Sequence, residues 1–336
     1  MRKIWISPEI ESIAKAYEKE VLDNHNPASN LQLLLNAISA QENLEHKALY
    51  YEYVKNIFDA FDENNLRYGE LLLVKPSKWS MVHARYFSSV QLDWLSENVT
   101  IGSVTQKFFM FVNDALGYEK LRGVVLRKYI AKLGIKACYY CNAQYAITAD
   151  EEEITGQVYA SYELDHCMPK AEYPYLSICF YNFHPSCSVC NKRKNKEYKA
   201  DTMYVEKVTE NPEMIHFSLS RQSIIRYMLS YDKEALEIEY ICKGGEEKKN
   251  EYEKVFHINS IYSQHKDEAE ELLWKARCYQ DDDIKAIFQQ YHKLFPRHSM
   301  EDFRRMLYGH HLLPSDVHKR PLNKMLSDIA QQMKII

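Results

Sequence analysis

The sequence of 336 residues predicts an α+β protein in which a small module of strands and a helix lies between two larger regions. Apolar residues recur at helical intervals in the first third of the chain, which predicts a mainly helical start. Two Cys-x-x-Cys pairs enclose the middle, and polar and apolar residues alternate over 236–242 as in a half-buried strand. We therefore divide the chain into a helical region at 1–130, the module at 131–200 and a mixed helix and strand region at 201–336.

The helical region has three strongly periodic stretches. Two of them cover 30–40 and 48–61, and the third runs from Leu121 to Leu133 and stops at Gly134. Glycine is typical of the position after a helix, so we expect this helix to lead directly into the first cysteine pair. We recognise no catalytic cluster in 1–130, and we expect the region to dock a partner or to select a substrate.

The cysteine pairs of the module are Cys138/Cys141 and Cys187/Cys190. Structural zinc is held by four ligands in a tetrahedron, and two knuckles with two thiolates each supply that set. The 45 residues between the pairs exceed the usual spacing and leave room for a folded insert. Four unrelated buried thiols or two disulfides are the alternatives, but paired spacing in a chain that is not secreted favours metal.

The insert between the pairs predicts two strands and a helix. Residues 144–148 and 158–165 suit the strands of a hairpin, with a charged turn at 150–153, and Pro169 prevents regular continuation of the second strand. Neighbouring side chains of a strand point to opposite faces, so Asp165 and His166 act together only if the chain twists there. Asn191 then opens the stretch 192–199, whose composition suits the first turns of a helix.

This segment resembles the HNH, or ββα-metal, endonucleases. The matching pieces are Glu163-Leu-Asp-His166, Pro169-Lys170, Tyr173-Pro-x-Leu176 and Asn182-Phe-His-Pro-Ser-Cys-Ser-Val-Cys-Asn-Lys192. The interval of nine from Asn182 to Asn191 is the one that the family shows between its middle Asn and its final metal ligand. The resemblance covers about a fifth of the chain and implies that the module is a zinc-stapled ββα-metal fold.

The resemblance also implies roles for four residues. His166 is expected to be the general base that deprotonates water for attack on a phosphodiester, since imidazole titrates near cellular pH. Asp165 and Asn191 are expected to hold one divalent cation, such as Mg²⁺, which prefers hard oxygen ligands. Asn182 is expected to orient the loop that carries His166. Many relatives have His where this chain has Asn191, a substitution that the family also uses.

Other residues of the segment have weaker interpretations. Glu163 lies two residues before Asp165, on the same strand face, and is the reserve candidate for a metal ligand or an orienting group. His184 is interpreted as structural or as a phosphate contact. Cys167 and Cys179 are interpreted as packing residues.

The formal net charge of −4 does not by itself indicate a nucleic-acid-binding protein, but the charge is unevenly distributed. Two basic runs flank the predicted site, and clustered Lys and Arg bind phosphates by displacing counterions. The alternative for each run is a solvated helix face. The residues concerned are Arg122, Arg127, Lys128, Lys132 and Lys136 in the first run, and Lys192, Arg193, Lys194, Lys196 and Lys199 in the second.

The last region predicts one strand and several helices. The strand at 236–242 ends at Gly244-Gly245, and 246–254 is charged and suits a loop or an exposed helix start. The stretches 267–277 and 283–294 are amphipathic helices, the second of which ends before Pro296, and the tail to Ile336 is also helical.

The segment His318-Lys-Arg-Pro-Leu-Asn-Lys324 resembles the ends of some bacterial HNH proteins that are encoded beside ATPases in phage-defence operons, the Septu-type subunits among them. That resemblance implies an antiviral defence effector. The chain has no Gly-rich phosphate loop and is not itself an NTPase, so a separate ATPase partner is the corresponding hypothesis. The competing interpretation is a non-catalytic, zinc-stapled module that binds nucleic acid or acts as a scaffold.

The cellular location follows from the start of the chain and from its cysteines. Met1 to Ile10 carry no long apolar region or cleavage pattern, and no apolar run approaches membrane-spanning length. Four scattered cysteines beyond the zinc ligands suit a reducing environment. We therefore expect a cytoplasmic endonuclease that contacts no membrane and acts on nucleic acid, with DNA as the expected substrate. RNA remains open, because a metal and a base do not distinguish the two.

Overall fold

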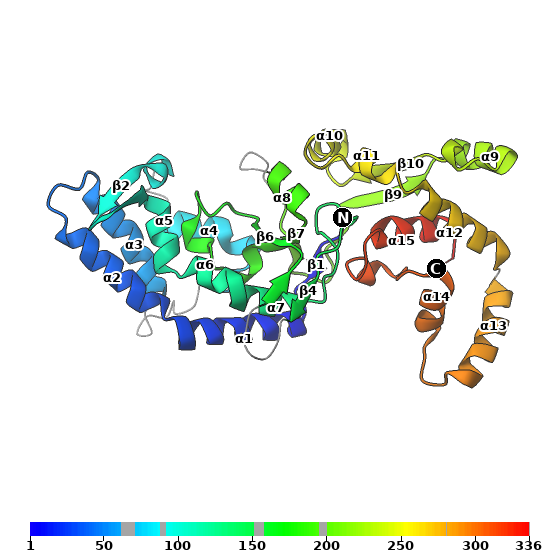
Figure 1. Ribbon diagram of the computed structural model, residues 1–336, viewed down its shortest axis with the longest axis horizontal. Helices are drawn as coiled ribbons and strands as arrows, with labels where there is room; N and C mark the ends of the chain where they lie inside the picture. Colours follow the sequence, from blue (N-terminus) through cyan, green and yellow to red (C-terminus); the bar gives the residue numbers. More distant parts are fainter. Residues whose placement is uncertain (62–70, 88–91, 151–157, 195–199, 280, 336) are drawn as a thin grey trace.

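The computed structural model describes residues 1–61, 71–87, 92–150, 158–194, 200–279 and 281–335. The molecule is an elongated α+β structure, with the N-terminal helices at one end, β6, β7 and α8 in the middle, and α9 to α15 at the other end (Figure 1). The sheets formed by the described residues each contain two strands. Short two-stranded sheets are marginal by themselves, so helices and side-chain contacts must hold them in place.

The predicted helices of the first region are present. The described elements there are β1 (Ile4–Trp5), α1 (Pro8–His25), α2 (Pro27–Ala40), α3 (Lys47–Phe61), η1 (Pro76–Lys78), α4 (Trp79–Tyr86), η2 (Leu92–Ser96), β2 (Asn98–Ile101), β3 (Val104–Lys107), α5 (Phe108–Ala115), α6 (Tyr118–Lys120), the π-helical turn η3 (Leu121–Leu126) and α7 (Arg127–Ala131). The hairpin of β2 and β3 was not predicted. Ser7 caps α1 by accepting a hydrogen bond from the Ile10 N–H at 3.3 Å, and Pro8 occupies the first turn.

The central module pairs its strands differently from the prediction. Its elements are β4 (Thr148–Asp150), β5 (Val158–Ala160), β6 (Glu163–His166), η4 (Pro174–Leu176), η5 (Phe180–Asn182), β7 (Phe183–Ser186) and α8 (Ser188–Lys194). The predicted strand at 158–165 is interrupted after Ala160, so that β5 pairs with β4 and β6 pairs with β7. The prediction that 144–148 is the partner of the whole strand was therefore wrong, because the chain changes partner at Ser161 and Tyr162.

The helix of the module also begins earlier than predicted. It starts at Ser188, directly after Cys187, so Asn191 lies one turn inside α8 and does not open it. The predicted range 192–199 extends beyond Lys194 into residues that lie outside the described part of the chain. The same is true of 151–153 in the predicted charged turn.

The last region contains β8 (Tyr204–Val205), β9 (Ile215–Leu219), α9 (Arg221–Ser230), η6 (Lys233–Ala235), β10 (Ile238–Cys242), α10 (Gly245–Phe256), α11 (Ile258–Tyr262), α12 (Lys266–Cys278), α13 (Asp281–Leu294), α14 (Met300–Tyr308), η7 (Pro314–Asp316) and α15 (Asn323–Gln332). The predicted strand is β10, which pairs with β9, and the charged stretch at 246–254 lies within helix α10. The predicted amphipathic helices correspond to α12 and α13.

Segments far apart in the chain are interleaved at the centre. β1 pairs in parallel with β8, and the Met1 carbonyl accepts hydrogen bonds from Met214 and Ile215 at 2.8 and 3.0 Å. Helix α15 lies along β9, where Asp328 accepts a hydrogen bond from the Phe217 N–H at 2.8 Å. One continuous hydrophobic core extends from Met1 to Ile335. Within the described ranges, no helix has both the length and the apolar character needed to cross a membrane.

His318 is a buried link between the first region, the module and the last region. Its Nε2 is 2.7 Å from the Arg2 carbonyl, its own carbonyl accepts a hydrogen bond from Lys136 at 2.8 Å, and its ring stacks on Tyr139. A carbonyl oxygen only accepts hydrogen bonds, so Nε2 carries the proton. Burial lowers the pKa of His318 from 6.5 to about 4, and the ring is neutral at physiological pH.

We predict that this buried ring makes folding sensitive to acid. The unfolded chain binds a proton near pH 6.5 and the folded one only near 4, so the stability conferred by neutral His318 is lost as the pH falls through this range. Between pH 7.5 and 5.5 the loss is about 1.4 kcal/mol of the free energy of unfolding. His318→Gln keeps a donor for the Arg2 carbonyl but cannot titrate. Urea unfolding at both values should show a loss smaller by that amount in the variant, and equal losses would contradict the assignment.

Candidate functional site

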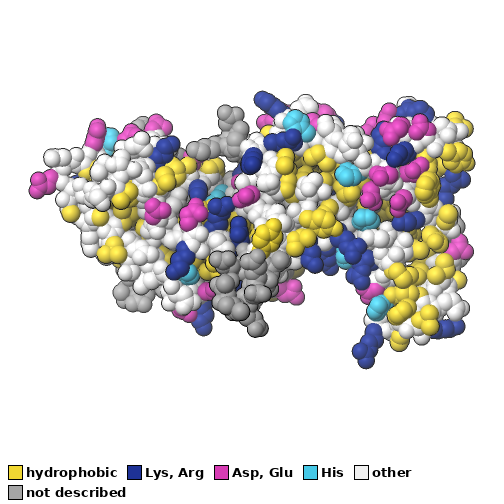
Figure 2. Space-filling view, in the orientation of Figure 1, with side chains coloured by type: hydrophobic (Ala, Val, Ile, Leu, Met, Phe, Trp, Pro, Cys, Tyr) yellow, Lys and Arg dark blue, Asp and Glu magenta, His cyan; other side chains and the backbone are white. Residues whose placement is uncertain are grey.

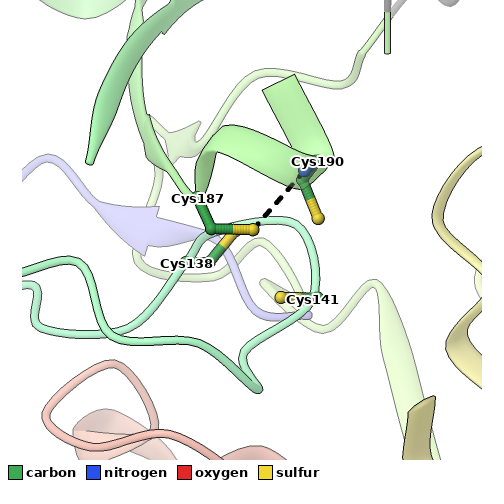
Figure 3. Close-up of side chains that lie close together, drawn as sticks. All are labelled: Cys138, Cys141, Cys187 and Cys190. Atoms are coloured by element: carbon green, nitrogen blue, oxygen red, sulfur yellow. Dashed lines mark hydrogen bonds between the residues drawn. The ribbon is translucent and has the colours of Figure 1, made fainter. Parts of the chain in front are cut away.

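The four predicted zinc ligands come together from two parts of the module. Cys138 and Cys141 lie in the loop between α7 and β4, whereas Cys187 precedes α8 and Cys190 lies in its first turn (Figure 3). All four are buried free thiols, and their sulfur atoms lie within 4.8 Å of one another. Zinc with bonds of about 2.3 Å places tetrahedral sulfurs about 3.8 Å apart. The cluster therefore fits a metal ion such as zinc better than two disulfides or four unrelated thiols.

The electrostatics of the cluster favour a bound cation. Burial raises the pKa of Cys138 well above its usual value, whereas hydrogen bonds from Cys138 and the other two thiols lower the pKa of Cys187. Four thiolates in one buried space repel each other, and a divalent cation offsets that repulsion. Backbone N–H groups also point at sulfur, since Cys190 N lies 3.4 Å from Cys187 Sγ (Figure 3).

A second group of possible metal ligands, formed by Glu213, His216 and Asp328, already contains a cation. The ammonium of Lys324 lies 2.7 Å from Glu213 Oε1 and 2.6 Å from Asp328 Oδ2. Hydrogen bonding to Glu213 raises the pKa of His216. Because the Lys324 charge neutralises the carboxylates, this group is a partly buried ion network that holds α15 against β9.

Asp165 is held through one of its two carboxylate oxygens. Lys194 Nζ lies 2.7 Å from Oδ2, and the Tyr140 hydroxyl donates a hydrogen bond to the same oxygen. Among the described residues, no group bonds Oδ1. The carboxylate is therefore fixed in direction and keeps one oxygen for another ligand.

His166 is held in the same way, through one ring nitrogen. Its Nε2 lies 3.0 Å from the Ser177 carbonyl, which can only accept, so Nε2 carries the proton and Nδ1 keeps a lone pair. Nδ1 has no hydrogen-bond partner within the described part of the chain. The ring lies between Phe183 and Tyr118, with centroid distances of 4.7 and 5.3 Å, and the residue is 7% exposed.

Burial is also the main reason why His166 is neutral. It lowers the pKa to about 3, and the nearby charges of Lys170, Lys194 and Arg122 lower it as well, against the hydrogen bond to Ser177. The expectation that this imidazole titrates near cellular pH was therefore wrong: the neutral ring can accept a proton, but with a pKa of about 3 it is a weak base. Each of these three cations is itself paired with a carboxylate, Lys170 with Glu119, Lys194 with Asp165 and Arg122 with Glu163.

Asn182 fixes the loop that follows His166. Its Oδ1 accepts a hydrogen bond from Met168 N at 2.7 Å, and its Nδ2 donates to the carbonyls of Met168 and Leu176, each at 3.0 Å. The buried amide thus joins both ends of the loop 168–176 and uses both of its polar atoms. The geometry is that of an orienting residue.

Asn191 is half-buried on α8, which packs against β6. It lies three residues before Lys194, so the two side chains share a face of the helix. Lys194 reaches Asp165 from this face, and Asn191 therefore lies on the side of α8 that is turned toward β6.

The register of β6 and β7 separates Asp165 from His166. Asp165 is opposite His184 and His166 is opposite Phe183, so the two predicted functional side chains occupy opposite faces of the ribbon. Lys194 connects them, because its Nζ also donates to the His166 carbonyl at 2.5 Å. His166 is the last residue of β6, and only beyond this end can groups from the two faces converge.

The structure bears on three further interpretations from the sequence. Lys194 was expected to bind phosphate in a basic run, but it is 3% exposed and is paired with Asp165. His184 cannot contact a phosphate here, since its buried ring bonds Tyr140 and the Met203 N–H. Glu163, the reserve candidate for a metal ligand or an orienting group, forms an ion pair with Arg122, with 2.8 Å between Glu163 Oε2 and the nearest guanidinium nitrogen.

The remaining basic residues are a mixture of paired and exposed groups. Arg122 also lies 3.6 Å from Glu119, and Lys128 lies 2.7 Å from Glu20. Figure 2 shows Lys and Arg side chains in the middle of one face, near β6, among scattered acidic groups. Lys196 and Lys199 lie outside the described residues. The first run is therefore partly neutralised within the chain.

Comparisons with protein-family models, with curated proteins and with solved structures found no match for this chain.

We predict that the cysteine cluster binds one zinc ion per chain. Cys190→Ser replaces a soft thiolate within the cluster, and the purified variant should lose zinc and unfold at lower temperature than the wild type. Elemental analysis and a thermal unfolding curve measure both effects. Cys179→Ser is the matched control, because this cysteine is equally buried but lies outside the cluster. Equal zinc contents in the two variants would contradict the assignment.

Proposed function

We propose that the chain is a metal-dependent HNH endonuclease that hydrolyses phosphodiester bonds. The observation that carries the proposal is the way in which the two central side chains are restrained. Asp165 is bound through Oδ2 and His166 through Nε2, so each keeps one acceptor atom at the end of β6. A purely structural pair would be expected to use all of its polar atoms.

In this proposal His166 Nδ1 accepts the proton of an attacking water. The Ser177 carbonyl fixes the tautomer and the direction of the ring, and burial keeps the ring neutral. Asp165 Oδ1 and the Asn191 amide oxygen would hold a divalent cation such as Mg²⁺. When bound, this cation neutralises charge on the phosphate and on the leaving oxygen. The substrate phosphate would lie beyond the last residue of β6, where groups from both faces of the ribbon converge.

Two cations lie at the edge of the site, each paired with a carboxylate for which a phosphate backbone would compete, Lys170 with Glu119 at 3.4 Å and Arg122 with Glu163 at 2.8 Å. Lys170 lies 4.0 Å from the centre of the Tyr118 ring, which itself packs on His166. Arg122 lies in the π-helical turn η3, which directly follows the helix α6 that carries Tyr118. These groups carry no base specificity, so they support a nucleic-acid substrate without selecting DNA or RNA. We propose duplex DNA as the first substrate to test, and an ATPase partner in a defence role stays a hypothesis from the sequence.

The proposal predicts that His166→Ala abolishes cleavage without loss of the fold. Removal of a general base typically costs about 10²- to 10⁴-fold in rate. We would measure cleavage of labelled duplex DNA, single-stranded DNA and transfer RNA by zinc-loaded protein, with Mg²⁺ and without added divalent cation. The wild type should cut one of the three substrates when Mg²⁺ is present and none without added divalent cation. The His166→Ala variant should keep the zinc content and melting temperature of the wild type.

The matched control for this experiment is His292→Ala, which removes an exposed imidazole from α13. It should cut at the wild-type rate. Cleavage by His166→Ala at the wild-type rate would refute the role of this residue. Binding of nucleic acid by the wild type without any cleavage would favour the non-catalytic, zinc-stapled binding module instead.

A further inference from the structure

Tyr140 lies inside the first cysteine knuckle and reaches the proposed cation site. It stands between Cys138 and Cys141, and its hydroxyl bonds both Asp165 Oδ2 and His184 Nδ1, the latter at 3.0 Å. The side chain is buried. One residue thus joins the four-cysteine cluster to the carboxylate that is proposed to hold the catalytic cation.

The backbone on both sides of this side chain is also fixed. The Tyr140 carbonyl accepts a hydrogen bond from the Tyr252 hydroxyl at 2.5 Å, and the Cys141 carbonyl accepts one from the Tyr262 hydroxyl at 2.7 Å. The preceding Tyr139 N–H donates to the Pro185 carbonyl on β7 at 2.9 Å. Helices α10 and α11 and strand β7 therefore hold the knuckle that carries Tyr140.

The hydrogen bonds that link Met203, His184, Tyr140 and Asp165 allow only one assignment of donors and acceptors. The Met203 N–H can only donate, so His184 Nε2 is the acceptor at 3.0 Å and the neutral ring carries its proton on Nδ1. Nδ1–H then donates to the Tyr140 oxygen. The Tyr140 O–H is left to donate to Asp165 Oδ2. Each polar group in this network is therefore fixed as donor or acceptor in each of its hydrogen bonds, and rotation of any one side chain breaks a buried hydrogen bond.

We propose that Tyr140 is a positioning residue that couples the cysteine cluster to the cation site, an inference that rests on the proposed function of Asp165. Together with Lys194 it occupies Oδ2 with two donors, so that the carboxylate presents Oδ1 to the cation. Lys194 alone would leave the carboxylate free to rotate, because a flexible ammonium has no preferred direction at the oxygen. His184 is the second positioning residue, since it sets the direction of the Tyr140 hydroxyl.

The experiment measures binding of Mn²⁺ alone, by electron paramagnetic resonance titration of zinc-loaded protein, and needs no cleavage. Tyr140→Phe removes only the hydroxyl and should weaken the Mn²⁺ site about 10- to 100-fold, as is typical when a group that orients a metal ligand is lost. Tyr139→Phe is the matched control in the same knuckle. Its hydroxyl contacts the Thr202 carbonyl and Met214 sulfur, and it should bind Mn²⁺ as the wild type does. Both variants should retain one zinc ion.

Asp165→Asn separates failure of this inference from failure of the proposed function. If Asp165→Asn loses the Mn²⁺ site and Tyr140→Phe does not, the positioning role is wrong and the cation site stands. If Asp165→Asn binds Mn²⁺ like the wild type, or if the wild type has no Mn²⁺ site, both proposals are wrong. Should Tyr140→Phe fail to fold, His184→Leu decides, because loss of the Nδ1 donor should weaken Mn²⁺ binding in the same direction. Unchanged Mn²⁺ affinity in His184→Leu would overturn the coupling.

Discussion

The four-cysteine cluster is the constraint on which the centre of the molecule depends. Strands β6 and β7 have four residues each and form a two-stranded ribbon, which is too short to be stable by itself. The cluster holds the loop at 138–141 against the start of α8, which directly follows β7, and so restrains the ribbon. Tyr139 adds a hydrogen bond to Pro185 on β7, and Tyr252 and Tyr262 hold the loop from the last region. The cysteine cluster and these hydrogen bonds form a frame around β6 and β7, and this frame sets the positions of Asp165 and His166.

The frame restrains the two side chains by a common principle. Each has one polar atom bound to a group with a single hydrogen-bonding role, a carbonyl that only accepts for His166 and an ammonium that only donates for Asp165, where the Tyr140 hydroxyl adds a second donor. Lys194 also bonds the His166 carbonyl and so fixes both residues from α8. A buried ammonium beside a carboxylate is costly unless both are hydrogen-bonded, and that condition is met here. The arrangement leaves Oδ1 and Nδ1 for the chemistry that we propose.

The sequence was sufficient for features that depend on local pattern. Helical periodicity predicted α2, α3, α12 and α13, and the spacing of the four cysteines predicted a shared cluster. Strand β7 was missed because Phe183-His-Pro-Ser is short, and its partner lies across a loop of 16 residues, 167–182. Partner choice in a sheet depends on such distant contacts.

The restraints on the site were missed for a similar reason. Lys194 belongs to a run of cations that favours an exposed face, and only the packing of α8 on β6 places it on Asp165. Its spacing from Asn191 and Cys190 was the one signal that it shares their helix face. The contact of His166 with the Ser177 carbonyl cannot be predicted from a sequence pattern, because every residue has a backbone carbonyl. Tyr140 could have been noticed as a polar residue enclosed by two cysteines of the cluster.

The most direct test of the account is a crystal structure of the zinc-loaded protein grown with Mn²⁺, in which anomalous scattering distinguishes the two metals. The account predicts zinc at the four cysteines and one Mn²⁺ bound to Asp165 Oδ1 and Asn191, with Lys194 and Tyr140 still on Oδ2. An ordered Mn²⁺ that does not contact Asp165, or zinc absent from the cysteine cluster, would contradict it.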